Sequence, residues 1–170
     1  QNGIAGVGGF TIRSNVFIGA KEQFSQNADW ITNKNNTFYR VSYETGHALA
    51  VGGISSSILQ TNIDISNCAF IDCGEAKTAS VGWFSSQDTS GSNFVNNFVA
   101  GPEVMGWAAK TSVASAPIDF NGGDPLFVNV WNPIGPDGLA FTADDGLRPM
   151  PNSPLAVNGI GALTAAAITV

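Results

Sequence analysis

Charged side chains are scarce in this chain of 170 residues. Only 12% of its residues are Asp, Glu, Lys or Arg, which is about half of the usual share. Lys and Arg number 7 together, they are scattered, and the formal net charge is −6. Nucleic acids and anionic membranes both attract proteins through clustered Lys and Arg. The charge therefore argues against both kinds of partner.

Long apolar runs and reactive side chains are also scarce. No segment reaches the ~18 consecutive apolar residues that a membrane-spanning helix needs. The two cysteines, Cys68 and Cys73, lie five residues apart, without a CxxC pattern or a nearby histidine, and this spacing disfavours a metal site. A disulfide in a secreted chain and two buried free thiols both remain open for this pair.

The sequence does have a recurring short motif, in which a polar residue and Asn precede Phe, an apolar residue and a turn. Its four copies are Ser14–Gly19, Asn35–Tyr39, Asn67–Gly74 and Asn96–Gly101. The phenylalanines of successive copies are 21, 32 and 28 residues apart. Such a period, with variable loops, predicts a solenoid whose units must stack because each is too small to bury its own apolar face.

A second apolar run follows three of the phenylalanines at a distance of roughly ten residues, which suits short strands joined by turns. These runs are His47–Gly52, Ala79–Phe84 and Glu103–Ala108. No window has a sustained 3.6-residue period, so long helices are not expected. The sequence predicts an all-β fold: a parallel β-helix of about four to six coils over residues 1–120, and a loop-rich tail over 121–170 that packs on or caps the coils.

Identical residues at one position of successive coils come into register. An interior aromatic stack is therefore predicted for Phe17, Phe38, Phe70 and Phe98. The alternative, a platform for stacking sugars, would require these rings to face outward. Asn tolerates sharp turns and forms hydrogen-bonded ladders in stacked strands. Such a turn ladder is predicted for Asn15, Asn36, Asn67 and Asn96.

The Ile-x-x-Asn-x-Phe runs resemble the parallel β-helix repeats of the pectate-lyase-like superfamily. The tail resembles the ends of such domains in secreted bacterial surface proteins, through Gly122–Asn129, Thr142–Arg148 and Pro151–Gly159. The resemblance implies a right-handed solenoid and a secreted or cell-surface location. Because the family contains lyases, hydrolases and adhesins, it implies a fold and not a reaction.

No complete catalytic set accompanies this resemblance. His47, the only histidine, lies in a stretch similar to the Gly-His-Gly of β-helical polygalacturonases. Those enzymes also need an upstream Asp pair and an Asn-Thr-Asp triplet as acid and base, and no Asp pair lies upstream of His47. A pectate lyase needs an acidic cluster and a basic residue, but Asp64 and Asp72 have no matching acids on adjacent units. A structural histidine is therefore favoured, and no catalytic residue is predicted.

One acidic loop is a candidate metal site. Asp137 and the pair Asp144-Asp145 each precede Gly and bracket a turn-rich segment. Ca²⁺ takes several carboxylate and carbonyl oxygens, and Gly permits the tight turn that such a site needs. The spacing is not that of an EF-hand. The alternative is that the three carboxylates cap turns of the loop.

Two classes of function follow. The first is a non-catalytic, secreted or cell-surface module, structural or adhesive, that builds filaments by contacting neighbouring copies or other surface proteins through its coil ends. It is favoured by the low charge, the missing catalytic set and the uncapped apolar ends at Ile4–Phe10 and Gly159–Val170. The second is a polysaccharide lyase or glycoside hydrolase, or a fragment of one. The start at Gln1, without Met, indicates processing or truncation.

Overall fold

A computed structural model describes residues 9–19, 24–26, 30–41, 49–51, 62–73, 81–83, 93–100, 118–119 and 124–162. His47, the run Glu103–Ala108, most of Ile4–Phe10 and the last eight residues lie outside the described residues. The predictions made for them are therefore not addressed by the structure.

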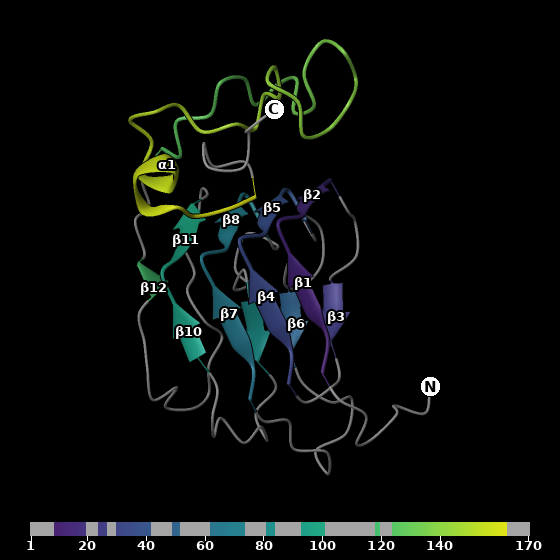
Figure 1. Cartoon of the computed structure of the whole chain (residues 1–170), viewed down its shortest axis with the longest axis vertical. Coiled ribbons are helices and arrows are strands. Elements are labelled where there is room, and N and C mark those ends of the chain that lie inside the picture. Colours follow the sequence, from purple (N-terminus) through teal and green to yellow (C-terminus); the bar gives the residue numbers. More distant parts are fainter. Residues whose placement is uncertain are drawn as a thin grey trace.

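Three parallel sheets account for all the strands that the structure describes (Figure 1). Sheet A has the spatial order β1 (Thr11–Arg13), β4 (Thr32–Lys34), β7 (Asp64–Ser66) and β10 (Asn93–Val95). Sheet B has the order β2 (Val16–Ile18), β5 (Thr37–Tyr39), β8 (Ala69–Ile71), β11 (Asn97–Ala100) and β12 (Ile118–Asp119). Sheet C has the order β3 (Phe24–Gln26), β6 (Leu49–Val51) and β9 (Val81–Trp83).

Each of the four motif copies supplies one strand to sheet B, and the residues just before it supply one strand to sheet A. We call the two strands and their turn a repeat. The repeats are residues 11–18, 32–39, 64–71 and 93–100. Each repeat pairs in parallel with the one that follows it in sequence. The predicted all-β class with parallel strands is confirmed, and the only helix among the described residues is the five-residue α1 (Pro154–Asn158).

A sharp turn separates the two strands of each repeat, and it is made by a residue with a left-handed backbone. We call these four residues the left-handed column. They are Ser14, Asn35, Asn67 and Asn96, with φ of 55°, 52°, 53° and 54°. Asn adopts this conformation more readily than most side chains because its short amide bonds locally. This backbone requirement explains why Asn occupies three of the four positions of the left-handed column.

The predicted aromatic stack is confirmed for three of its four phenylalanines. Phe17, Phe38 and Phe70 are in register in sheet B, and their rings stack in parallel with centroids 4.7 and 4.9 Å apart. Phe38 and Phe70 are fully buried. The prediction is wrong for Phe98, because Val99 pairs with Phe70. The fourth repeat is offset by one residue from the alignment of phenylalanines, and such an offset places Phe98 on the other face of the sheet.

The predicted asparagine ladder mixes two adjacent columns. Asn67 and Asn96 belong to the left-handed column, whereas Asn15 and Asn36 belong to the next position, which we call the turn column. The register of β8 and β11 completes the turn column with Cys68 and Asn97. Asn15, Asn36, Cys68 and Asn97 therefore form one column, and a cysteine takes the place of the third asparagine.

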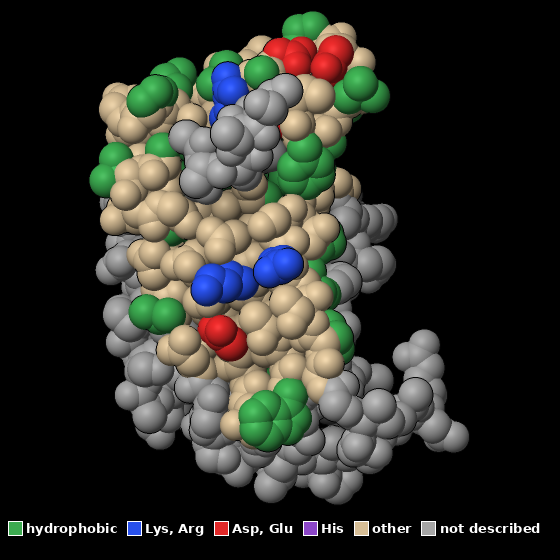
Figure 2. All heavy atoms as spheres, in the orientation of Figure 1, with side chains coloured by type: hydrophobic (Ala, Val, Ile, Leu, Met, Phe, Trp, Pro, Cys, Tyr) green, Lys and Arg blue, Asp and Glu red, His purple; other side chains and the backbone are tan. Residues whose placement is uncertain are grey.

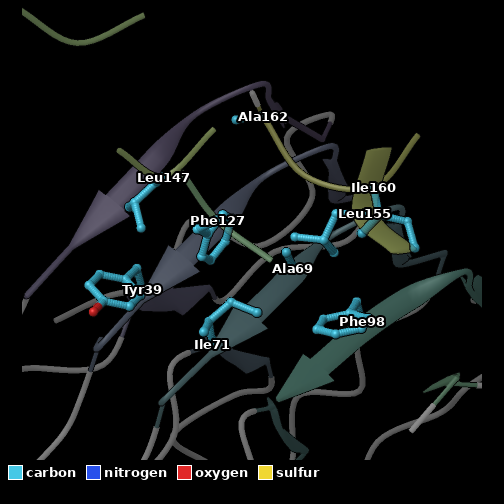
Figure 3. Close-up of a cluster of buried hydrophobic side chains, with 9 residues drawn as sticks. All are labelled: Tyr39, Ala69, Ile71, Phe98, Phe127, Leu147, Leu155, Ile160 and Ala162. Carbon is cyan, nitrogen blue, oxygen red and sulfur yellow. The ribbon is translucent and has the colours of Figure 1, made fainter. Parts of the chain in front are cut away.

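The tail lies over sheet B (Figure 1). It covers the face opposite to the stacked phenylalanines, because the sheet residues that it contacts alternate with them along the strands. Figure 3 shows the side chains that meet there. A buried cluster joins side chains of sheet B to side chains of the tail. The sheet contributes Tyr39, Ala69, Ile71 and Phe98, and the tail contributes Phe127, Leu147, Leu155, Ile160 and Ala162. Burial of apolar area is the main favourable term here. Phe98 therefore anchors the tail instead of filling the interior.

Hydrogen bonds fix the tail on the left-handed column. The side-chain amide of Asn35 donates to the Gly159 carbonyl at 2.8 Å, and that of Asn96 donates to the Asn158 carbonyl at 3.2 Å. The backbone N–H of Gly161 donates to the Asn67 carbonyl at 2.8 Å. The turns that join the strands of the repeats therefore also hold the tail.

Helix α1 positions this contact. Ser153 caps its first turn by accepting a hydrogen bond from the Leu155 N–H at 3.0 Å, and its hydroxyl donates to the Pro125 carbonyl at 2.6 Å. Pro154 occupies the first turn, where no backbone donor is needed, and Gly159 ends the helix with a φ of 65°. The capped helix places the buried Leu155 in the cluster.

Candidate functional site

The outer face of sheet A is polar except for the exposed Val95, and it carries two neighbouring basic side chains. Its strands alternate, so that their first and third residues face outward while Ile12, the buried Asn33 and the buried Ile65 lie between them. On the face that sheet A presents in Figure 1, Figure 2 shows basic side chains side by side with an acidic one below them. This face is the first of three candidate sites.

Arg13 and Lys34 are directly paired in the register of β1 and β4, and both are exposed. Like charges opposite each other on one sheet face repel. No salt bridge joins either side chain to a residue that the structure describes. The acidic neighbour on this face, Asp64, instead accepts a hydrogen bond from the Asn93 amide at 3.3 Å. The pair is therefore suited to an anionic group.

The pair of Arg13 and Lys34 is not among the sites predicted from the sequence. The signal that could have found the pair is position, because each lies two residues before an asparagine of the turn column, Asn15 and Asn36. Residues at equal offsets from a repeat landmark become neighbours once the repeats stack.

The other sequence candidates for catalysis are not brought together. Asp64 lies in β7 of sheet A, whereas Asp72 follows β8 of sheet B. Burial raises the pKa of Asp72, and the Arg40 guanidinium opposes this shift. Within the described ranges, no group of three or more His, Cys, Asp or Glu side chains could hold a metal ion by itself.

The acidic loop is the second candidate site, and each of its carboxylates supports a turn. Asp137 Oδ1 accepts the Leu139 N–H at 2.8 Å. Asp144 accepts the Thr142 hydroxyl on Oδ1 at 2.7 Å and the Asp137 N–H on Oδ2 at 3.3 Å. Asp145 Oδ2 accepts the Thr142 N–H at 3.0 Å. The turn-capping alternative for this loop is thus realised, while the Ca²⁺ alternative stays a prediction.

The electrostatics of the two adjacent acids differ. The hydrogen bond from the Thr142 hydroxyl lowers the pKa of Asp144. Burial raises the pKa of Asp145, and the charges of Asp137 and Asp144 raise it further. Asp145 is only 1% exposed, and its Oδ1 receives no hydrogen bond from the described residues. Oδ1 is therefore the one buried side-chain oxygen or nitrogen of the described loop without a hydrogen bond.

The two cysteines are free thiols. Cys68 is buried, with Sγ 3.5 Å from the Asn33 carbonyl oxygen, and the Sγ of Cys73 lies 3.2 Å from the Phe38 carbonyl oxygen. Burial raises the pKa of both thiols to about 12. A reactive cysteine needs a lowered pKa, so neither is suited to nucleophilic chemistry.

The edges of the sheets are the third candidate site. Among the described strands, β1 pairs only with β4, and at the far side of sheet A β10 pairs only with β7. Thr32 N–H donates to the Phe10 carbonyl and Ser14 N–H to the Lys34 carbonyl, both at 3.0 Å. In this alternating pattern the backbone groups of Thr11 and Arg13 point away from β4. They face the edge of the sheet.

Comparison with models of protein families, with curated proteins and with solved structures finds no match to this chain. In the part of the chain that the structure describes, no helix is long and apolar enough to cross a membrane. The resemblance to pectate-lyase-like repeats stays a prediction.

Proposed function

We propose that the chain is a right-handed parallel β-helix that serves as a non-catalytic structural module of an extracellular surface, and that it assembles head to tail. Each repeat then forms two sides of one coil, and the three sheets are the sides of the solenoid. Sheet A, sheet B and sheet C each contain strands in the order of the sequence, which is the order that coiling produces.

The observation that carries the assembly is the parallel direction of both edge strands of sheet A. Strand β10 of one copy and β1 of the next can continue the ladder, because all four strands run the same way. Exposed edge N–H and C=O groups pair readily with another strand. A contact between two different edges can be repeated from copy to copy. It gives a filament when the rotation between successive copies does not close into a ring.

A proline at the edge tests this proposal. Thr11→Pro removes an N–H that points away from β4, so it should block pairing with another copy and leave the β1–β4 ladder intact. We expect wild type and the control Thr11→Val to form oligomers that grow with concentration, by sedimentation and electron microscopy, and Thr11→Pro to stay monomeric with an unchanged circular dichroism spectrum. A wild-type protein that stays monomeric at its highest soluble concentration would refute the assembly.

The second candidate function is binding and cleavage of an acidic polysaccharide on sheet A. It is favoured by the exposed pair of Arg13 and Lys34, which offers two adjacent positive charges to a chain of carboxylates. The double variant Arg13→Gln/Lys34→Gln should weaken retention on immobilised polygalacturonate, whereas Arg148→Gln in the tail should not. Release of unsaturated or reducing ends by the wild type would support the enzyme and overturn the non-catalytic proposal.

A further inference from the structure

The strongest unexplained feature of the molecule is the carboxylate of Asp145. Its residue is almost completely buried, and Oδ1 lacks a hydrogen-bond donor among the described residues, although Oδ2 is bonded to the Thr142 N–H at 3.0 Å. A buried polar atom without a partner is costly, and native structures rarely leave one unsatisfied. Oδ1 therefore needs either a bound proton or a neighbouring cation.

Backbone oxygens crowd the residue that follows Asp145. A Cβ atom added to Gly146 would lie 2.0 Å from the Asn129 carbonyl oxygen and 2.1 Å from the Asn132 carbonyl oxygen. Any side chain at this position would collide with backbone, which cannot give way cheaply. Glycine is thus required for the carbonyl oxygens to approach this part of the loop. Each of these carbonyl oxygens also accepts one backbone N–H, from Asn132 at 3.3 Å and from Gly135 at 3.1 Å. Each keeps a second lone pair, of the kind that hard cations bind together with carboxylates.

The charge of the loop has the same sign as the buried carboxylate. Asp137 and Asp144 both act on Asp145 as like charges. Asp137 Oδ1 accepts the Leu139 N–H, and the two oxygens of Asp144 accept the Thr142 hydroxyl and the Asp137 N–H. They attract a cation electrostatically without having to be its direct ligands, which agrees with the lack of a group of three metal-holding side chains in the described residues.

We infer that the loop from Asn129 to Gly146 binds one divalent hard cation, of which Ca²⁺ is the best candidate, through Asp145 Oδ1, backbone carbonyl oxygens and water. The cation supplies the missing partner of Oδ1 and neutralises the repulsion among the three acids. Since Asp145 lies two residues before Leu147 of the buried cluster, binding ties the loop to the contact between the tail and sheet B. The inference does not depend on the proposed assembly.

Thermal unfolding of the full chain tests it. After treatment with a chelator, addition of millimolar Ca²⁺ should raise the Tm of the wild type by roughly 3–6 °C, because the ion binds only the native state. Asp145→Asn should lose this shift. Asp124→Asn is the matched control, since it removes an equal charge from an exposed carboxylate of the tail that caps the Leu126 N–H, and it should keep the shift.

A direct binding measurement covers the case in which Asp145→Asn does not fold. Isothermal titration of the chelator-treated wild type with CaCl₂ should give one site per chain. The inference is overturned if the wild type shows neither heat of binding nor a rise in Tm with Ca²⁺, which would mean that Asp145 holds a proton instead. It is also overturned if a folded Asp145→Asn variant keeps the full shift.

Discussion

Asn36 and Asn97 make the same two hydrogen bonds, each with the repeat that precedes it. In both, the amide oxygen accepts a backbone N–H, at 3.0 and 2.9 Å, and the amide nitrogen donates to a backbone carbonyl, at 2.9 and 2.8 Å. Cys68 holds the equivalent place between them, and its thiol lies 3.5 Å from the equivalent carbonyl, that of Asn33. Because a thiol is a weak donor and acceptor, the turn column is weakest at Cys68.

Replacing this thiol by an amide should stabilise the protein. Cys68→Asn would let the third repeat make the same two bonds with the second, which should raise the free energy of unfolding by about 1 kcal/mol. Urea denaturation would measure the change. The control is Cys68→Ala, which removes the thiol without adding an amide and should be less stable than Cys68→Asn. If Cys68→Ala were more stable than Cys68→Asn, the assignment of Cys68 to the turn column would be wrong.

Both thiols should be inert in the folded protein. With pKa values raised to about 12 by burial, the reactive thiolate is a very small fraction at neutral pH. Ellman's reagent should detect almost no thiol in the native protein and two per chain in concentrated urea. Rapid reaction of the native protein would contradict the burial, and absence of thiol in urea would reveal a disulfide.

Truncation of Phe70, the last ring of the stack, should be costly. Phe70→Ala leaves a cavity beside the ring of Phe38, and we expect a loss of about 3–5 kcal/mol in the free energy of unfolding. Phe141→Ala is the control, since Phe141 is half exposed and should lose less than ~1 kcal/mol. A loss below about 1 kcal/mol for Phe70→Ala would argue against the interior stack.

The tail should loosen when Gly161 gains a side chain. Gly161 has a φ of 86°, and a Cβ there would lie 2.7 Å from Thr37 Oγ1, the atom that accepts the Ala162 N–H at 2.9 Å. Gly161→Ala should therefore speed proteolysis of the tail. Gly19→Ala is the matched control, because its φ of 62° imposes similar backbone strain but its Cβ would meet nothing within 4 Å. Equal rates of proteolysis for the two variants would mean that backbone strain, and not the collision with Thr37, loosens the tail.

The buried carboxylate of Asp145 should make the cation-free protein less stable as the pH rises. Its folded pKa lies above the ordinary 3.8 because of burial, so the native state holds the proton more tightly than the unfolded state. This contribution is complete below about pH 4 and is lost as the pH rises toward the folded pKa. Asp145→Asn should remove the decline, as measured by urea denaturation in chelator across the acidic range.

The difference between the pH profiles of wild type and Asp145→Asn reports the titration of Asp145. Asp72, whose pKa burial also raises, and Asp144, whose pKa the Thr142 hydroxyl lowers, are present in both proteins. Identical pH profiles for wild type and Asp145→Asn would show that the carboxylate titrates normally.

The sequence by itself determined the class of structure. Repeated Asn and Phe at periods too short for independent domains leave stacking as the way to bury the apolar positions, and the parallel pairing of Phe17, Phe38 and Phe70 confirms this. The left-handed turns follow equally from local chemistry, because Asn35, Asn67 and Asn96 suit a conformation that most side chains avoid. These features depend on neighbours in the chain and on the repeat.

Only the tertiary structure decided the register of the fourth repeat and the burial of Asp145 in the acidic loop. Phe70 aligns with Val99 and not with Phe98 because the backbone pairs Cys68 with Asn97, and a one-residue offset exchanges the faces of a strand. Phe98 can face outward only because the tail covers it, and that contact joins residues more than twenty positions apart. Burial of Asp145 and the pairing of Arg13 with Lys34 likewise arise when distant segments meet, and a local pattern does not encode such proximity.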